Sequence, residues 1–186
     1  MDNRNSRTKK MMLWFGMISM SMTFAGLTSA YVVSSSRADW LEGFVLPQAF
    51  SYSTLIILLS SLTFFVAKRS LQQNKLAQFK GMLWVTLALT VAFINLQFQG
   101  FNEIISSGYY FTGAESSITT SFLYVLVLLH LAHVTGGFVV LSVVLVNAYR
   151  NQYSPEKTLG VELAELFWHF LDFLWLYLFL FVTIYQ

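Results

Sequence analysis

The sequence predicts an all-α integral membrane protein with five transmembrane helices in one bundle. Of its 186 residues, 56% are hydrophobic and only 11% are charged, whereas about a quarter of the residues of a soluble domain are charged. Five apolar windows are long enough to cross a bilayer core, which takes about 20 helical residues. None alternates apolar and polar residues as membrane-barrel strands do. We therefore expect a single transmembrane domain, residues 1–186, with spans near 11–33, 46–67, 81–101, 122–149 and 163–185.

The first expected span carries a seam of small residues spaced three, four, three and four apart: Gly16, Ser19, Thr23, Gly26 and Ala30. Such a seam lets another helix approach closely in lipid, where packing drives association. The partner helix belongs either to the same bundle or to another subunit. The window is longer than the apolar stretch of a signal peptide, about 7–15 residues, so we interpret it as a retained signal-anchor.

The second and third spans are joined by a basic segment, and two further basic segments precede the first span and separate the fourth from the fifth. Ten of the eleven Lys and Arg residues lie in these three segments: Arg4, Arg7, Lys9, Lys10, Lys68, Arg69, Lys75, Lys80, Arg150 and Lys157. Basic loops stay in the cytoplasm, and only Arg37 lies on the other side. We expect a cytoplasmic N-terminus and an external C-terminus. The net charge of +2 reflects this topology rather than nucleic-acid binding.

The fourth span carries His130 and His133, two of the three histidines of the chain. Their separation of three residues places both imidazoles on nearly one face of a helix, close to the middle of the bilayer. The chain has no cysteine, which excludes disulfides and thiolate metal sites.

The fifth span carries four ionisable residues three or four positions apart, and therefore on one helix face: Glu162, Glu165, His169 and Asp172. Ionisable groups at membrane depth face a bundle interior, a water pocket or a partner. Glu162 and Glu165 lie near the helix N-terminus, where the dipole favours a carboxylate by about 0.3–1 kcal/mol. Asp172 lies nearly three turns further in, so we expect it to have a specific partner.

Three interpretations of these side chains remain open. The first is a buried polar network that joins the last two helices, made of His130, His133, His169 and Asp172. The second is a proton-handling or lipid-headgroup role for the carboxylate face of the fifth span. The third is a metal ion, or one haem held between His169 and a histidine of the fourth span. We can pick out no nucleophile–base pair or phosphate-binding loop, and we expect no catalytic residue, cofactor or metal in this chain.

The last two spans carry two specific motifs. They are Glu162 followed by Trp168-His169-Phe170, Asp172 and Trp175-Leu176 in the fifth span, and His130-x-x-His133-Val134-x-x-Gly137 in the fourth. In these motifs the chain resembles the cytochrome c oxidase subunit III family of haem-copper terminal oxidases, in its five-helix bacterial form. The resemblance covers about residues 11–186 and is weaker over the first three spans. The chain departs from the family at Phe24 and Gly100, where the family commonly has glutamates.

The resemblance implies an accessory subunit without a redox centre, in the inner (cytoplasmic) membrane of a bacterium. Haem and copper would lie in partner subunits I and II, which reduce dioxygen and pump protons. This chain would pack beside subunit I, bind phospholipid and support stability and proton uptake, with a larger respiratory supercomplex as a further partner. We expect lipid or subunit contacts at Glu162, Glu165, Trp168 and Trp175, and helix packing at Gly137 besides the small seam.

Other functions are considered beside this one. Within the same superfamily, the chain could be subunit III of a quinol oxidase or an accessory protein of a nitric oxide reductase, because electron donor and acceptor are chosen elsewhere in the complex. A small membrane cytochrome b would need one haem between His130 or His133 and His169. A proton-coupled transporter would need a conducting polar path, and the polar groups cluster on the last two spans, so this alternative ranks last.

Overall fold

All secondary-structure elements in the described part of the chain, residues 2–37, 40–41, 46–111 and 117–185, are helices. The computed structural model contains five: α1 Asp2–Ser34, α2 Gln48–Gln72, α3 Leu76–Ser106, α4 Ile118–Tyr149 and α5 Leu159–Ile184. All five are long and apolar enough to cross a membrane, which confirms the predicted fold class. Most helices extend a few residues beyond the expected windows, because helical hydrogen bonding continues into the polar ends.

Local signals set several helix ends. Pro47, at the N-cap of α2, has an extended ψ of 143° and cannot donate a backbone hydrogen bond. The Ser117 side chain accepts a hydrogen bond from the backbone N–H of Thr120 and caps α4. Asn74 and Asn151 adopt positive φ values of 60° and 52° in the two short connections, α2–α3 and α4–α5. Asparagine tolerates this left-handed conformation better than most residues.

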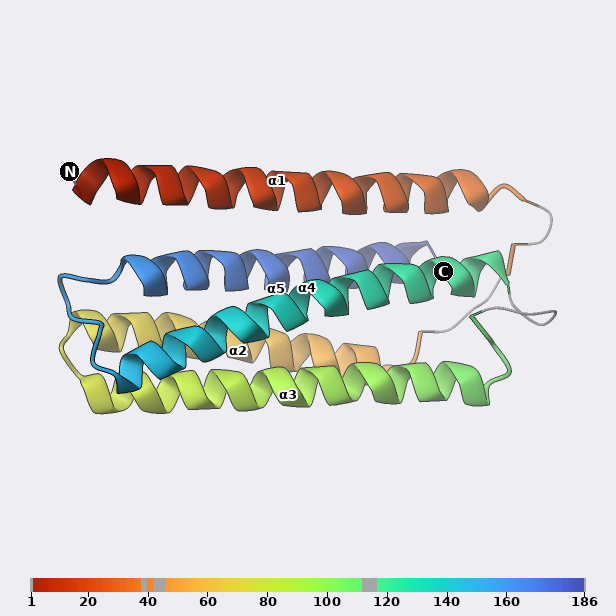
Figure 1. The fold of residues 1–186 in the computed structure, drawn as a ribbon. Coiled ribbons are helices and arrows are strands. Elements are labelled where there is room, and N and C mark those ends of the chain that lie inside the picture. Colours follow the sequence, from red (N-terminus) through yellow and green to blue (C-terminus); the bar gives the residue numbers. More distant parts are fainter. Residues whose placement is uncertain (1, 38–39, 42–45, 112–116, 186) are drawn as a thin grey trace.

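Helices α2, α3, α4 and α5 form a closed ring, and α1 lies against the outside of it. Helix α2 packs on α3 and α5, and α4 also packs on α3 and α5, while α1 contacts only α4 and α5. Figure 1 shows α1 along one side of the bundle, with its N-terminus at the same end as the α2–α3 and α4–α5 connections. We call this the basic end, because most of the Lys and Arg residues of the chain lie there. The C-terminus lies at the opposite end.

Two glycines allow helices to approach closely in the core. A Cβ atom on Gly100 of α3 would lie 2.6 Å from the Phe50 ring of α2. A Cβ atom on Gly137 of α4 would lie 2.7 Å from a methyl group of Leu171 and 3.2 Å from the Trp168 ring, both on α5. The expected packing role of Gly137 therefore corresponds to a close α4–α5 contact.

Helix α1 uses one narrow face to pack on the bundle. Its buried residues recur at helical spacing and face α4 and α5: Met17, Phe24, Thr28 and Tyr31. The small-residue seam lies on another side. Ser19, Thr23, Gly26 and Ala30 are exposed, and a Cβ atom on Gly16 or Gly26 would meet nothing within 4 Å. No described helix packs against the seam, and contact with another subunit remains the prediction for it.

Candidate functional site

The polar face of α5 meets α2 at several levels of the bundle. At the basic end, the Lys68 ammonium of α2 donates to Glu165 Oε2 at 2.5 Å. One turn further along α5, His169 Nδ1 lies 2.5 Å from the Ser61 hydroxyl of α2. His169 Nε2 lies 3.8 Å from Glu165 Oε1, a distance suited to an ion pair but long for a direct hydrogen bond. These contacts place a chain of polar groups between the two helices.

Two tryptophans of α5 continue the same contact line. The Trp168 indole N–H donates to the Ser60 hydroxyl at 3.1 Å, and the Trp175 indole N–H donates to the Thr54 hydroxyl at 2.9 Å. Both indoles are 2% exposed, so they point into the chain rather than toward lipid or another subunit. We call the whole line of contacts the α2–α5 seam: Thr54, Ser60, Ser61 and Lys68 on α2 with Glu165, Trp168, His169 and Trp175 on α5.

Asp172 lies beside this seam and is buried, with 3% of its surface exposed. Neither of its carboxyl oxygens has a hydrogen-bond partner among the described residues. The nearby Ser61 hydroxyl makes its close contact with His169 instead. A buried carboxyl group without a partner is costly, so Asp172 is the most unusual polar group of the bundle interior.

The two histidines of α4 have different surroundings. His130 is fully buried, and neither ring nitrogen has a hydrogen-bond partner in the described part of the chain. Its ring packs 5.2 Å from the Trp175 ring, 6.2 Å from Phe93 and 6.5 Å from Phe24, measured between centroids. His133 is partly buried, and its Nδ1–H donates to the Leu129 carbonyl at 2.7 Å. The structure thus joins His169 to α2, and no described hydrogen bond joins His130 to His169 or Asp172.

The side chains do not fit a haem or a metal ion. Among residues 2–37, 40–41, 46–111 and 117–185, no group of three or more His, Cys, Asp or Glu side chains could hold a metal. The aromatic rings packed around His130 leave no space for a porphyrin beside its imidazole. His169 Nδ1 is already bonded to Ser61.

Glu162 belongs to a separate polar group at the basic end. Its carboxylate accepts hydrogen bonds from Lys10 of α1 at 2.8 Å and from the Thr158 hydroxyl at 2.7 Å. It also lines a surface hollow of about 710 Å³ between the start of α1 and the α4–α5 connection, together with Lys9, Lys10 and Lys157. This hollow is open and polar, and its charged residues are three lysines and two glutamates, Glu156 and Glu162.

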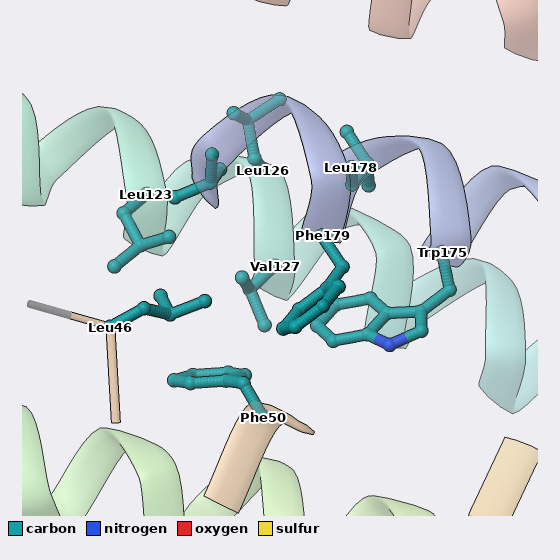
Figure 2. Close-up of a pocket in the computed structure, with 9 residues that line it drawn as sticks. Leu46, Phe50, Leu123, Leu126, Val127, Trp175, Leu178 and Phe179 are labelled. Atoms are coloured by element: carbon teal, nitrogen blue, oxygen red, sulfur yellow. The ribbon is translucent and has the colours of Figure 1, made fainter. Parts of the chain in front are cut away.

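A small apolar cavity lies toward the opposite end of the bundle. Its volume is about 10 Å³, and Phe50, Val127, Trp175 and Phe179 are among the residues around it. Figure 2 shows these side chains crowding together from α2, α4 and α5. A space of this size is at the lower limit for one water molecule, and an apolar lining keeps such cavities dry. The cavity therefore offers no group for chemistry.

The α2 half of the seam is the part of the site that sequence reasoning missed. A signal for it exists: Thr54, Ser61 and Lys68 are seven residues apart in sequence, as are Glu165 and Asp172 on α5. A spacing of seven returns to nearly the same helix face. Two matching polar stripes in otherwise apolar helices indicate that the two helices are neighbours.

Comparisons with known proteins give a consistent result. The sequence model of the family described as "Cytochrome c oxidase subunit III" matches residues 12–186. The chain is 31% identical to cytochrome c oxidase subunit 3 of Bacillus sp. strain PS3, over 93% of this chain and 84% of the relative. It is 30% identical to cytochrome bo(3) ubiquinol oxidase subunit 3 of Pseudomonas putida, over 89% of this chain and 80% of the relative. It is also 27% identical to cytochrome c oxidase subunit 3 of Thermostichus vulcanus, over 88% and 80%.

Proposed function

This chain belongs to the cytochrome c oxidase subunit III family, and on that premise we propose that it is the non-redox accessory subunit III of a haem-copper terminal oxidase. The observation that carries the proposal is the family match, which covers nearly the whole chain, residues 12–186. In the proposed complex, haem and copper are bound by subunits I and II. The present chain contributes packing surface, lipid contacts and support for proton uptake.

We favour a cytochrome c oxidase of the aa3 type as the complex. A ubiquinol oxidase is the second candidate, because the Pseudomonas putida relative carries that name at 30% identity. In both kinds of oxidase the electron donor binds outside subunit III, so the same role in the complex is expected of this chain.

The open side of α1 supports a contact with subunit I. Its small residues are exposed although such seams serve close helix packing in lipid. Bound phospholipid is supported by the polar hollow near Glu162, where Lys9 and Lys157 suit an anionic headgroup at the membrane surface. Assembly into a larger respiratory supercomplex would use the remaining exposed apolar surface of the bundle.

The proposed orientation places the basic end in the cytoplasm and the C-terminus outside, in the inner membrane of a bacterium. It is supported by the positive-inside rule. Lys10, Lys68, Lys80 and Lys157 lie at the ends of helices or in connections that meet at the basic end. Arg37 follows α1 at the other end.

The test is to purify the tagged chain from its native membrane in mild detergent and identify the proteins that migrate with it. We expect oxidase subunits I and II, a haem spectrum that stays with them when this chain is stripped off, and oxygen consumption driven by reduced cytochrome c. Activity only with ubiquinol would assign the complex to the second candidate. Nitric oxide reduction, or haem retained by the isolated chain, would refute the proposal.

A further inference from the structure

We propose that two copies of this chain pair in the membrane through one face of α3, side by side and in the same orientation. We call it the outer face of α3, and it consists of Val85, Ala88, Ala92, Asn95, Gln99 and Asn102. The proposal goes beyond the role of an accessory subunit within one complex. It rests on the spacing, the exposure and the chemistry of these side chains.

The outer face lies on the side of α3 that points away from α2. The opposite side is buried against α2, where the Thr86 hydroxyl lies 2.8 Å from the Thr63 hydroxyl and Gln97 donates to Ser53 at 2.8 Å. Its buried residues recur at intervals of four and three: Leu83, Thr86, Thr90, Phe93 and Gln97. The outer face repeats this spacing two residues later. Two residues correspond to a rotation of roughly 200° around a helix with 3.6 residues per turn.

No described helix covers the outer face. Five of its residues are exposed, and Ala92 is half-buried. Among the described helices, α3 contacts only α2 and α4. Figure 1 shows α3 on the side of the bundle opposite α1. The small-residue seam of α1 therefore stays available for the contact proposed with subunit I, and the two contacts do not compete.

The amide groups of the outer face indicate that it contacts protein rather than lipid. Asn95 Nδ2 donates to the Val91 carbonyl of its own helix at 2.9 Å. In the described part of the chain, Asn95 Oδ1 and the Gln99 amide have no hydrogen-bond partner. Asn95 lies six residues before the end of the apolar window at residue 101, about 9 Å inside the hydrocarbon core at 1.5 Å per residue. Lipid tails offer an amide no partner, so a polar group here favours packing against another helix.

A second copy of α3 satisfies these groups because a carboxamide both donates and accepts hydrogen bonds. All copies of the chain cross the membrane in one direction, so a two-fold axis along the membrane normal brings each residue opposite its own copy at the same depth. Asn95 then meets the Asn95 of the second copy. Nearer the basic end, Val85, Ala88 and Ala92 are small enough for the two backbones to approach closely. Amides within such a contact fix its register.

Larger side chains border the outer face and shape it for this contact. Trp84, Val91 and Phe98 are exposed along one edge, and Leu89 and Leu96 are half-buried along the other. Small positions between two rows of larger ones form the holes into which a facing helix inserts its side chains.

A hollow beside Asn95 gives further room at the same level. Its volume is about 120 Å³, and it lies between α3 and α4, where Val91, Ile94, Thr135 and Phe138 also line it. The surface is thus concave at the depth where the amide needs a partner. A side chain of the second copy fits there.

Oxidative cross-linking in native membranes that carry the assembled complex tests the proposal. The chain has no cysteine, so a single Ala88→Cys variant reports on one position. A membrane-permeant oxidant should link two copies of this variant about tenfold faster or more than two copies of Leu62→Cys, because pairing raises the effective concentration of the thiols. Leu62 is 62% exposed on α2. It lies about 15 Å from the basic end of its helix, and Ala88 about 18 Å from the basic end of α3, so the control has a similar depth.

Two further variants test the amide contact itself. Asn95→Leu in the Ala88→Cys chain keeps an exposed position filled but removes the amide pair, and the cross-linking rate should fall about threefold or more. Asn95→Gln keeps a carboxamide and should preserve the cross-link. In wild-type membranes, two differently tagged copies of the chain should also be recovered together in polymer-enclosed membrane discs.

Three results would overturn the proposal: equal cross-linking of Ala88→Cys and Leu62→Cys, a cross-link from Ala88→Cys to a different subunit, or a rate that Asn95→Leu leaves unchanged. The pair is measured between copies of this chain. Its failure is therefore distinguishable from failure of the proposed function, which would appear as the absence of subunits I and II from the same membranes.

Discussion

Gly100→Ala is the perturbation whose outcome follows most directly from the structure. Gly100 lies inside α3, and an added Cβ atom would come within 2.6, 2.8 and 3.1 Å of three carbon atoms of the Phe50 ring. Optimal contacts between carbon atoms are about 3.5–4.0 Å. The ring would have to retreat by about an ångström, and it is 1% exposed, stacked on Trp175 and edge-on to Phe101.

Two opposing contributions set the size of the effect. Replacing glycine by alanine inside a helix stabilises it by roughly 0.5–1 kcal/mol. Overpacking a well-filled core destabilises it by about 1–3 kcal/mol. The difference predicts that Gly100→Ala lowers the free energy of unfolding by about 1–2 kcal/mol. Gly81→Ala on the same helix is the control, because a Cβ atom there meets nothing within 4 Å; it should leave stability unchanged or raise it.

The assay is unfolding of the purified chain in mixed detergent micelles, followed by circular dichroism and tryptophan fluorescence. Phe50→Leu, which removes the obstructing ring, should cost less in the Gly100→Ala background than in the wild type, since the two changes act on one contact. If Gly100→Ala proved as stable as Gly81→Ala, the close α2–α3 approach inferred here would be wrong.

Two further predictions concern charge and topology. Lys68→Met removes the charged hydrogen bond to the buried Glu165 carboxylate and should lower stability by about 2 kcal/mol. Lys10→Met breaks an exposed pair and should cost less than about 1 kcal/mol. Denaturant titrations compare the two variants, and equal losses would contradict the difference in burial. Since the chain has no cysteine, single Ser107→Cys and Gln152→Cys variants report orientation: an impermeant thiol reagent on intact cells should label the first and not the second, and the reverse pattern would invert the proposed topology.

The sequence was sufficient to predict the five helices and the polar face of α5, because long apolar windows and a three-to-four spacing are properties of single segments. The helix that this face contacts could not be predicted from the sequence of α5 alone. Expecting α4 as the partner followed from its histidines and its adjacency in sequence. In the ring of helices, α5 is wedged between α2 and α4, and its hydrogen-bonding side chains turn to the hydroxyl groups of α2. Which neighbour a face meets depends on the packing of all the helices together.

The two departures from the family pattern have a steric explanation that the sequence alone did not provide. At Gly100 the space beyond Cα is filled by the Phe50 ring, so no larger side chain fits without rearrangement. At Phe24 the ring is fully buried and lies 5.6 Å from the His133 ring and 6.5 Å from His130. An aromatic contact between α1 and α4 thus stands where the family commonly places a carboxylate.

The position of α1 outside the ring has a consequence for biogenesis. A membrane protein is synthesised from its N-terminus, so α1 is made before α4 and α5. Yet among the described helices it contacts only α4 and α5, and α5 is the later of the two. Helix α1 must therefore remain in the lipid without these neighbours until α4 and α5 have been translated. During that interval its direction across the membrane is held by its own basic residues, among them Arg7, Lys9 and Lys10.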